Sequence, residues 1–394
     1  MHSSPVRLAI VGGHRGAHFS NVMSYLQNEI KLVAVCDLDE CTVRKWQESD
    51  SQLRGYTSYE ELLNDPDVDA VFLATPMLLH ARQAIQAMRA GKHVLSEVIA
   101  ATTLEECWEL IETVQATGKK YMLAENYCFM RPNMLIMNMV KANVFGKLTF
   151  MEGAYIHDCR SLLHDANGNM TWRGRLQRDY NGMNYPTHSF GPLAMWMGLN
   201  RDGSDRLESI STFTSPAAAV RRYYTDVVQP AHPHVEDVNW KQGDFAVSIL
   251  RTASGVLIQL RLDWTSGVPH DMARYGLQGE NGAYTWSSTM APSVWVQGRS
   301  PGSSWGSPAE WESLWNYSDE FEHSWWRDMG AEADQAGHGG GDLFVIREFA
   351  AAIRENRNPV IDVYDAVLWS SIFPLSMESA AKRGAEVAIP NFRK

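Results

Sequence analysis

The stretch from Val6 to Asp37 constrains the fold more than any other part of this sequence. It begins with a short apolar run over residues 6–11, typical of a strand buried in a parallel sheet. A glycine-rich turn over residues 12–16 follows, and a second apolar run ends on Asp37. Between the runs, apolar side chains recur at helical spacing, at Phe19, Val22, Met23 and Leu26. This order of strand, glycine turn, helix, strand and acid is that of a dinucleotide-binding βαβ unit.

The glycine turn and the acid have separate roles in such a unit. Glycines let the backbone approach a pyrophosphate at the first turn of the helix, and the acid accepts hydrogen bonds from ribose hydroxyls. A strict G-x-G-x-x-G pattern is missing, because the letters from residue 12 onward are G-G-H-R-G-A. An ordinary tight turn is the alternative, but the flanking strands and the acid favour nucleotide binding. We expect NAD rather than NADP, bound by Gly12, Gly13, His14, Arg15, Gly16 and Asp37.

Composition and charge exclude several classes of function. The chain has 394 residues, of which 45% are hydrophobic and 21% charged, as in a globular protein large enough for two domains. Its net charge of −11 disfavours nucleic acid and anionic membranes as partners. The five cysteines form no C-x-x-C pair, and no apolar run approaches the roughly 20 residues of a membrane span. A strand that begins at residue 6 leaves no room for a signal peptide, so we expect a cytoplasmic protein.

Strands and helices continue to alternate after Asp37. The expected elements are strands over residues 67–74, 93–96 and 121–124, and helices over residues 80–90 and 103–118. This alternation predicts an α/β Rossmann domain with a doubly wound parallel sheet over residues 1–128. Ligands bind beyond the carboxyl ends of such strands, although each polar residue there is alternatively a cap or turn residue. Further cofactor contacts are expected from Thr75, His80, Glu97 and Asn126.

From about residue 130 the pattern changes to strands joined by hairpin-like turns, after one helix over residues 131–143. The expected strands cover residues 148–155, 208–214, 244–250, 256–262, 283–286 and 293–297. Strands without intervening helices predict an α+β domain over residues 129–394 with a large, mainly antiparallel open sheet. Two helices, over residues 342–356 and 362–383, finish the chain, and Pro374 is expected to interrupt the second. We assign substrate binding and self-association to this domain.

Two other stretches leave alternatives open. Six of the 14 tryptophans lie between residues 295 and 326, which is equally typical of a wall against a sugar ring and of a subunit interface. Residues 232–237 contain metal-ligand types, but no further cluster with ligand spacing supports them. An exposed acidic loop is the better interpretation, and we expect no metal site.

Residues 91–97 read G-K-H-V-L-S-E. This segment is similar to the G-K-H-V-(L)-x-E segment of the Gfo/Idh/MocA superfamily of NAD(P)-dependent sugar oxidoreductases. The two-domain plan resembles that superfamily too, and the resemblance extends over nearly the whole chain. In that superfamily Lys-Pro follows, and the lysine assists hydride transfer; here Val98 and Ile99 stand instead. Its D-x-G-x-H motif aligns with residues 184–188, where His188 is kept but Asn184 replaces the aspartate. The chain is therefore either a non-catalytic binding protein or a branch that uses the nicotinamide differently.

Six segments together resemble glycoside hydrolase family 109, NAD-dependent α-N-acetylgalactosaminidases of the same fold. They are Glu97–Ala101, Met122–Cys128, Gly153–Arg160, Trp172–Arg173, Asn184–Pro192 and Gly337–Gly340. The pattern Y-P-T-H followed by G-P is the most specific of them. The chain departs from that family at Ile99, where proline is common, and at Phe129, where tyrosine is common.

The resemblance implies a redox-neutral mechanism. Hydride passes from C3 of a pyranoside to bound NAD⁺, and the resulting ketone acidifies the C2 proton. A base removes that proton, the aglycone leaves C1, water adds, and the hydride returns to C3. Such a site needs a base and groups that orient hydroxyls more than a carboxylate pair.

The resemblance also nominates site residues. His188 is the first choice for acid–base work at C3, with Tyr185 beside it, and a capping or core histidine is the alternative. Tyr127 is the candidate base for the C2 proton, with Tyr155 as its rival. An inter-strand salt bridge is the alternative for Arg160, and a residue that merely precedes a helix cap is the alternative for His338. The expected sugar-binding residues are His157, Arg160, Trp172 and His338.

Two other functions remain open at the level of the sequence. One is a sugar or inositol dehydrogenase that uses His188 without the lysine. The other is a non-catalytic protein that binds NAD or a sugar. In each case the expected partners are a small-molecule glycoside or sugar and further copies of the chain, as a dimer or tetramer through the outer face of the open sheet.

Overall fold

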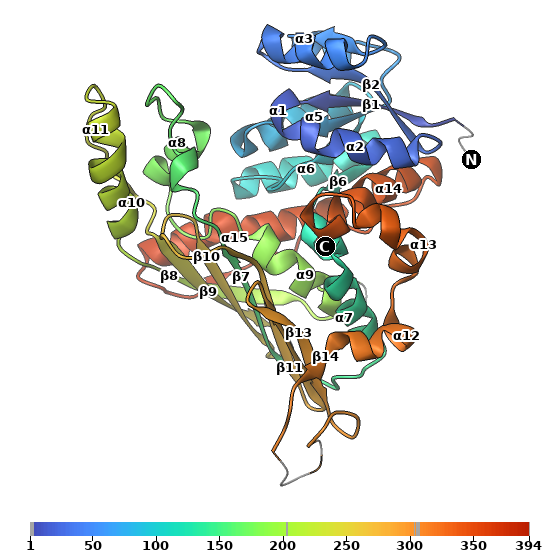
Figure 1. The fold of residues 1–394 in the computed structure, drawn as a ribbon, viewed down its shortest axis with the longest axis vertical. Coiled ribbons are helices and arrows are strands. Elements are labelled where there is room, and N and C mark those ends of the chain that lie inside the picture. Colours follow the sequence, from blue (N-terminus) through green and yellow to red (C-terminus); the bar gives the residue numbers. More distant parts are fainter. Residues whose placement is uncertain (1–3, 202–203, 303, 305–307, 394) are drawn as a thin grey trace. The chain divides into compact units, whose positions relative to one another are not determined.

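The computed structural model describes residues 4–201, 204–302, 304 and 308–393. These residues form two compact units (Figure 1). The first unit runs to Met134 and resumes over His323–Ser371, and the second comprises Leu135–Glu322 and Ile372–Phe392. The sequence predicts a domain boundary near residue 128. It does not predict that the chain returns to the first unit later in the sequence.

The first unit contains a six-stranded sheet in the order β3-β2-β1-β4-β5-β6, and each of these neighbouring pairs is parallel. This confirms the predicted doubly wound Rossmann sheet. The strand order reverses between β1 and β4, which is where such sheets bind ligands. The strands are β1 (Val6–Val11), β2 (Ile30–Cys36), β3 (Arg54–Tyr56), β4 (Ala70–Leu73), β5 (His93–Ser96) and β6 (Tyr121–Leu123).

The helix predicted after the glycine turn is broken into short α and 3₁₀ pieces, yet all four of its predicted apolar side chains are buried. Helix α14 (Gly341–Arg354), from late in the sequence, packs against α2 and β1. The helices between the strands are α1 (Gly13–Gly16), α2 (Ser20–Met23), α3 (Glu40–Ser49), α4 (Tyr59–Leu63), α5 (His80–Arg89) and α6 (Leu104–Thr117). Helix α13 (Ser324–Ala333) and the 3₁₀ turn η8 (His338–Gly340) precede α14.

The second unit contains a nine-stranded sheet in the order β14-β13-β12-β11-β7-β10-β9-β8-β15. It is mainly antiparallel, as predicted, but β7 and β10 pair in parallel, with Ile156 opposite Asp263. The carboxyl ends of these two strands therefore meet at one edge of the sheet. The strands are β7 (Leu148–Ile156), β8 (Leu207–Thr214), β9 (Phe245–Thr252), β10 (Leu257–Asp263), β11 (Asp271–Gly279), β12 (Gly282–Ser287), β13 (Met290–Val296), β14 (Glu312–Ser313) and β15 (Val387–Ala388).

The prediction of strands without intervening helices is wrong. Helices α8 (Trp172–Asp179), α9 (Thr187–Met197) and α10 (Ala218–Tyr223) lie between β7 and β9 in the chain, and α9 packs on β7, β10 and β11 (Figure 1). Gly191 and Pro192 lie inside α9, and both residue types disfavour a helix interior. Tertiary burial of nearly the whole helix outweighs that local preference.

The predicted interruption of the last helix at Pro374 is also wrong. Helix α15 (Val363–Ala381) continues through this proline, whereas the earlier α7 (Arg131–Lys141) agrees with its predicted range to within two residues. Most of α15 is buried, so packing compensates for the hydrogen bond that proline cannot donate. None of the helices in the described part of the chain is both long and apolar enough to cross a bilayer.

One face of the open sheet exposes large apolar side chains. Phe213 on β8, Phe245 and Ile249 on β9 and Leu257 on β10 are each more than a third exposed. The strand registers place them on the same face. Contiguous apolar surface of this kind favours self-association, which stays a prediction for this protein.

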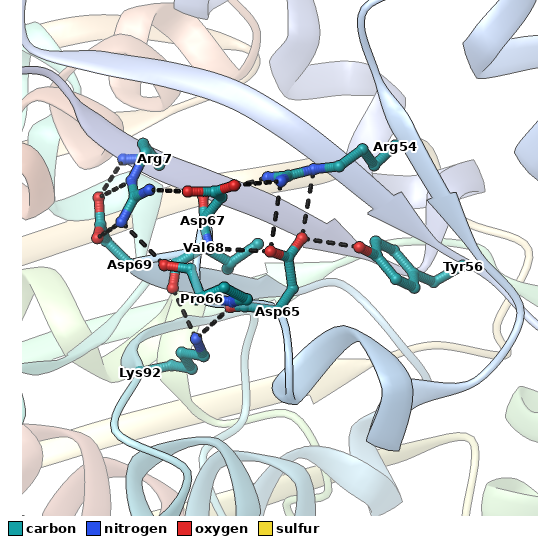
Figure 2. Close-up of polar contacts among 9 residues, drawn as sticks. All are labelled: Arg7, Arg54, Tyr56, Asp65, Pro66, Asp67, Val68, Asp69 and Lys92. Carbon is teal, nitrogen blue, oxygen red and sulfur yellow. Dashed lines mark hydrogen bonds and ion pairs between the residues drawn. The ribbon is translucent and has the colours of Figure 1, made fainter.

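The amino-terminal edge of the Rossmann sheet is held by a network of charged side chains (Figure 2). Arg7 from β1 bonds to Asp67 and Asp69 at 2.7 and 2.8 Å, and Arg54 from β3 pairs with Asp65 and Asp67. The strand predicted from residue 67 begins only at Ala70, although the backbone of Asp69 already hydrogen-bonds to Arg7 on β1 and to His93 on β5. The network lies at the edge opposite the glycine turn.

Asp65 is the central acid of this network. Burial acts to raise the pKa of its carboxyl, but a 2.7 Å hydrogen bond from the Tyr56 hydroxyl, the Asp67 N–H and the Arg54 charge lower it below its usual value. Burial and the same hydrogen bond raise the pKa of Tyr56 to about 12. The backbone carbonyls of Asp65 and Val68 also accept hydrogen bonds from the Lys92 ammonium, at 2.6 and 2.8 Å.

We expect Asp65→Asn to destabilise the protein at pH 7 by about 1–2 kcal/mol. Because the pKa of Asp65 is lower in the folded state than in the unfolded chain, its contribution is complete above about pH 4 and is lost as pH falls below that value. Urea unfolding at pH 7 and pH 3.5 measures this. The matched control is Glu112→Gln at an exposed position of α6. A difference that stays the same at both pH values would contradict the assignment.

Candidate active site

The glycine turn after β1 has the backbone that a nucleotide site needs. Gly12 adopts a left-handed conformation with φ of 97°, and a Cβ atom there would lie 2.5 Å from the carbonyl oxygen of Ala74 after β4. Only glycine fits this position, so the turn passes directly over the point where the strand order reverses. The backbone N–H of Gly13 donates to the Asp37 carboxylate at 2.8 Å, which fixes the turn to the end of β2.

Two neighbouring groups make the turn rigid. The Trp46 indole N–H on α3 donates to the carbonyl of Gly13, and His14 Nε2 lies 3.2 Å from the Thr42 hydroxyl. Arg15 extends the other way and forms a 2.6 Å ion pair with Glu97 after β5. The structure thus brings together the predicted residues of the glycine turn, Asp37 and Glu97.

Thr75 and His80 lie after β4, and their side chains form hydrogen bonds with residues near them. The Thr75 hydroxyl donates to the Gln83 side chain, and the ring nitrogens of His80 lie 2.9 and 2.8 Å from the carbonyl oxygens of Ile99 and Thr75. His80 is fully buried, and this burial lowers the pKa of its imidazole despite both carbonyls. Direct contact of these two side chains with the cofactor stays a prediction.

Asn126, Tyr127 and His338 come together beyond β6. The Asn126 amide donates to the Asp342 carboxylate at 2.7 Å, and that carboxylate also bonds to His338 Nδ1 at 2.9 Å. The rings of Tyr127 and His338 are 6.1 Å apart. Burial raises the pKa of the Tyr127 phenol well above its usual value, which makes the phenolate form costly.

These residues fit a bound NAD. The turn at Gly12 is open to backbone approach, an acid lies at the end of β2, and the Asn126 side-chain oxygen is buried without a hydrogen-bond partner among the described residues. A buried unpaired carbonyl of this kind suits the amide donor of a nicotinamide. In that case Gly12 and Gly13 hold the pyrophosphate, Asp37 holds a ribose, and Asn126 holds the nicotinamide end. Gly16 instead allows the helix to pack closely on β1, because a Cβ there would lie 2.2 Å from the Ile10 side chain.

The second unit gathers aromatic and imidazole side chains at the carboxyl edge of β7 and β10. His157 follows β7, and its N–H donates to the carbonyl of Asp263 at the end of β10 at 2.8 Å. Trp264 directly follows β10, and His270 immediately precedes β11. We call the following set the edge cluster: Tyr155, His157, Tyr185, His188, Trp264 and His270.

Close ring contacts hold the edge cluster together. The ring of His188 lies 4.9 Å from that of Tyr155 and 5.1 Å from that of Tyr185. Tyr185 contacts Trp264 at 5.0 Å, and His157 contacts His270 at 4.7 Å. His188 is in the first turn of α9, where its backbone carbonyl accepts from the Tyr275 hydroxyl at 2.6 Å. The structure therefore brings Tyr185 and His188 together, as predicted from their spacing.

His157 is neutral at physiological pH. Burial lowers the pKa of its imidazole to about 4, helped by the positive charges of His270 and Arg173 and opposed by Asp158. The Tyr155 hydroxyl bonds to His157 Nδ1 at 2.9 Å. A neutral imidazole beside a phenol presents paired donor and acceptor groups, which are the groups that recognise sugar hydroxyls.

Arg160 and Trp172 lie in the segment that follows β7. Arg160 pairs with Asp158 at 2.8 Å within its own loop, so the predicted alternative of an inter-strand salt bridge is wrong. The Arg173 guanidinium stacks 4.4 Å above the Trp172 ring at the start of α8. Sugar contacts from Arg160 and Trp172 stay predictions.

The tryptophan-rich stretch is divided in the structure. Trp326 is buried and donates to the carbonyl of Phe129, and Trp325 stacks on the Phe129 ring at 5.9 Å, within the first unit. Trp311 and Trp315 are exposed, and Trp305 lies outside the described residues. Both interpretations of this stretch, a wall against a sugar ring and a subunit interface, stay predictions.

Three residues of these clusters were not predicted as site residues, namely Trp264, His270 and Asp342. Trp264 and His270 reach the edge only because β10 runs parallel to β7 and is followed by β11. The sequence shows hairpin-like turns and carries no signal for parallel pairing of two strands about 100 residues apart. Asp342 is expected from the sequence only as a helix cap, although its four-residue spacing from His338 was visible.

Comparisons with known proteins support both units. Residues 6–125 match the oxidoreductase family with an NAD-binding Rossmann fold, and residues 129–394 match the glycosyl hydrolase 109 C-terminal domain. A glycosyl hydrolase family 109 protein of Solibacter usitatus is 33% identical over 402 residues, covering 99% of this chain and 88% of that protein. The alpha-N-acetylgalactosaminidase of Shewanella oneidensis is 33% identical over 404 residues, covering 99% and 85% respectively.

Solved structures share the fold at lower sequence identity. Levoglucosan dehydrogenase in complex with NADH and levoglucosan has a TM-score of 0.77 at 17% identity, covering 98% of this chain and 100% of its own. An inositol dehydrogenase homolog from Azotobacter vinelandii, complexed with NADH and myo-inositol, has a TM-score of 0.70 at 18% identity, covering 98% of both chains. These matches confirm the predicted fold class.

We expect Asp37→Asn to weaken NAD⁺ binding at least tenfold, since the amide loses both a charged acceptor for ribose and the support of the Gly13 N–H. The affinity for NADP⁺ should fall by a smaller factor than that for NAD⁺, or should rise, because the variant lacks the carboxylate that repels the 2′-phosphate. Isothermal titration calorimetry with both dinucleotides measures this against Glu48→Gln, at an exposed position of α3. Equal loss for both dinucleotides would contradict the ribose assignment.

We expect His157→Asn to make the protein less sensitive to acid. The pKa of His157 is about 4 in the folded state, so folded wild type loses stability as pH falls from about 6.5 towards 4. The variant lacks this titrating group. Between pH 7 and pH 4.5, its free energy of unfolding should therefore fall less than that of wild type, by a difference on the order of 2 kcal/mol. Urea unfolding at both pH values tests this, with the exposed His234→Asn as control. Equal losses in variant and wild type would contradict it.

Proposed function

Because this chain belongs to glycosyl hydrolase family 109, we propose that it hydrolyses glycosides by a redox-neutral route through a 3-keto sugar. C3 is first oxidised, the C2 proton and the aglycone at C1 are eliminated, water adds to C1, and C3 is reduced again. When bound, NAD supplies the hydride acceptor and donor for C3, so the cofactor ends the cycle unchanged. The chain is accordingly an NAD-dependent glycosidase.

The chemistry of the edge cluster is the observation that carries this proposal. Its six members are imidazoles, phenols and one indole, whereas direct glycoside hydrolysis uses two carboxylates that flank the bond. The neighbouring Asp263 carboxylate is already engaged by the Ser266 hydroxyl and by an ion pair with Arg261. The cluster is therefore suited to moving hydroxyl protons rather than to displacement by a carboxylate.

We assign roles to five of the six residues of the edge cluster. His188 accepts the proton of the C3 hydroxyl during oxidation and returns it during reduction, and Tyr185, whose ring lies 5.1 Å away, orients that hydroxyl. Neutral His157 and the hydrogen-bonded Tyr155 hold a neighbouring hydroxyl through paired donor and acceptor groups. The aromatic face of Trp264 packs against the sugar ring.

A sugar dehydrogenase is the second candidate, because solved sugar dehydrogenases share the fold. In the superfamily to which the sequence is similar, a lysine follows the conserved glutamate and an aspartate precedes the histidine. Here Val98 and Asn184 hold those positions, and both are buried. The Asn184 amide donates to the Gln242 side chain at 3.1 Å, so its side chain takes part in a buried hydrogen bond of the core. This arrangement favours the glycosidase over simple dehydrogenation.

The decisive experiment follows two signals at once. Purified protein with NAD⁺ is incubated in D₂O with p-nitrophenyl α-N-acetylgalactosaminide, the first choice because of the name of the Shewanella relative, and with a panel of other α- and β-glycosides. We expect release of nitrophenol, no net NADH, and deuterium at C2 of the product. NADH accumulation without nitrophenol would replace the proposal with a dehydrogenase.

Substitution of His188 links the activity to the edge cluster. We expect His188→Asn to lower kcat by about 10²–10⁴-fold, since general acid–base catalysis contributes a factor of this size. NAD⁺ affinity and melting temperature should stay close to those of wild type. The matched control is His234→Asn, on an exposed loop of the same unit, which should leave kcat unchanged.

A further inference from the structure

His270 is the member of the edge cluster to which the reaction above gives no role. Asp271 lies opposite Ile156 where β11 pairs with β7, so the next positions beyond the sheet, His270 and His157, are neighbours. Their rings are 4.7 Å apart at an interplanar angle of 68°. His270 is exposed, whereas His157 is half-buried. Neither ring nitrogen of His270 has a hydrogen-bond partner in the described part of the chain, so both are available to a ligand.

The two imidazoles differ in which of them holds a positive charge. Two charged imidazoles in contact repel each other, so their surroundings decide where the proton lies. Burial, together with the positive charges of His270 and Arg173, lowers the pKa of His157 to about 4. Exposed His270 keeps its hydration, and the nearby Asp158 carboxylate, although paired with Arg160, favours a positive charge on it. The pair therefore consists of a neutral imidazole on the buried side and a proton donor on the exposed side.

Successive contacts within the edge cluster run from a buried end to an exposed end. His188 is 6% exposed, and its ring lies 4.9 Å from that of Tyr155. The Tyr155 hydroxyl bonds to His157, and His157 contacts exposed His270. In the proposed function His188 acts at C3, and Tyr155 with His157 holds the substituent next to it. A pyranose ring that follows this order has C1 on the side of His270.

Exposure agrees with this orientation of the sugar. The aglycone is released to water during the reaction, so the glycosidic oxygen belongs at the exposed end of the edge cluster. His270 is the exposed imidazole at that end, and it immediately precedes β11. A proton donor placed there meets the oxygen on which negative charge develops when the C1–O bond breaks.

We propose that His270 is the general acid that protonates the glycosidic oxygen as the aglycone leaves. The inference rests on the proposed function, because the step that it assists is elimination from a 3-keto sugar. A base takes the C2 proton, the C2–H electron pair forms the C1–C2 double bond, and the C1–O bond breaks. Its electron pair goes to the aglycone oxygen, which takes the proton of the His270 imidazolium. When water adds to C1, the neutral imidazole accepts a proton from that water, and the base returns a proton to C2.

The dependence of the rate on the leaving group tests this role. p-Nitrophenoxide is a weak base and leaves without a proton, whereas methoxide is a strong base and needs one. For the sugar whose p-nitrophenyl glycoside wild type cleaves, we expect His270→Asn to lower kcat for the methyl glycoside by about 100-fold or more. The kcat for the p-nitrophenyl glycoside should fall by less than about threefold, because its departure does not depend on general acid catalysis. Equal losses with both glycosides, or no loss with either, would overturn the proposal.

Deuterium exchange identifies the step at which the variant stops. In D₂O, His270→Asn should still oxidise C3 and release the C2 proton, so methyl glycoside recovered uncleaved should carry deuterium at C2. Recovered glycoside without deuterium would overturn the proposal, since the defect would then precede departure of the aglycone. The matched control is His234→Asn, another exposed histidine of the same unit, which should cleave both glycosides at the rate of wild type. Melting temperature and NAD⁺ affinity should be those of wild type in both variants.

The charge of the histidine pair is measured without a substrate. His270→Asn removes the positive charge beside His157, so the pKa of His157 should rise by roughly 0.5 or more, the effect of a like charge at this separation even in water. NMR titration of wild type and variant, each with ¹⁵N-labelled histidine, measures this change. An unchanged pKa of His157 would overturn the assignment of the proton to His270. If wild type releases nitrophenol from none of the glycosides, the proposed function is refuted, and this role of His270 with it.

Discussion

The parallel pairing of β7 with β10 is the constraint on which the chemistry of the second unit depends. In an otherwise antiparallel sheet, successive strands end at opposite edges, and residues that follow them are separated by the length of a strand. Because Ile156 lies opposite Asp263 in parallel register, His157 and Trp264 emerge at the same edge. His270 adds to this edge just before β11 begins, and Tyr185 and His188 come from the residues that lead into α9 and from its first turn. One non-local pairing thus gathers side chains from four separate segments.

In the Rossmann unit, parallel pairing has the same consequence for the whole sheet. All of its neighbouring strands are parallel, so the glycine turn, Thr75, Glu97 and Asn126 follow strands that end at one edge. The charged network of Arg7, Arg54 and Lys92 lies at the other edge, where it fastens the strands without interfering with a ligand (Figure 2). The residues that stabilise the sheet and the residues expected to contact a ligand therefore lie at opposite ends of the strands.

This difference between the units explains what the sequence predicts well. Strand, turn and helix alternate locally in the first unit, and the right-handed crossover of each βαβ segment leaves little choice of topology. In the second unit the strands were found from their alternation, but neither β11 nor the β7–β10 pairing has a local signature. Helix α9 contains Gly191 and Pro192, which disfavour a helix interior, and Pro374 is the reason that the sequence predicts an interruption of α15. In each case tertiary burial overrides the local preference.

The candidate site follows the same pattern. Tyr185 and His188 are three residues apart, so their proximity is readable from the sequence. Asp342 is four residues from His338 and could have been paired with it, whereas its contact with Asn126 spans 216 positions and requires the fold. Residues that act through a partner distant in the chain are those that sequence analysis alone does not find.

Burial also bears on why the proposed site consists of imidazoles and phenols and lacks the lysine and aspartate of the superfamily. Val98 and Asn184 are 3% and 0% exposed, and their surroundings have become part of the core. A lysine at position 98 or an aspartate at position 184 would bring an uncompensated charge into this environment at a cost of several kcal/mol. A histidine titrates near neutral pH when unperturbed, and burial can lower its pKa, as the surroundings of His157 illustrate.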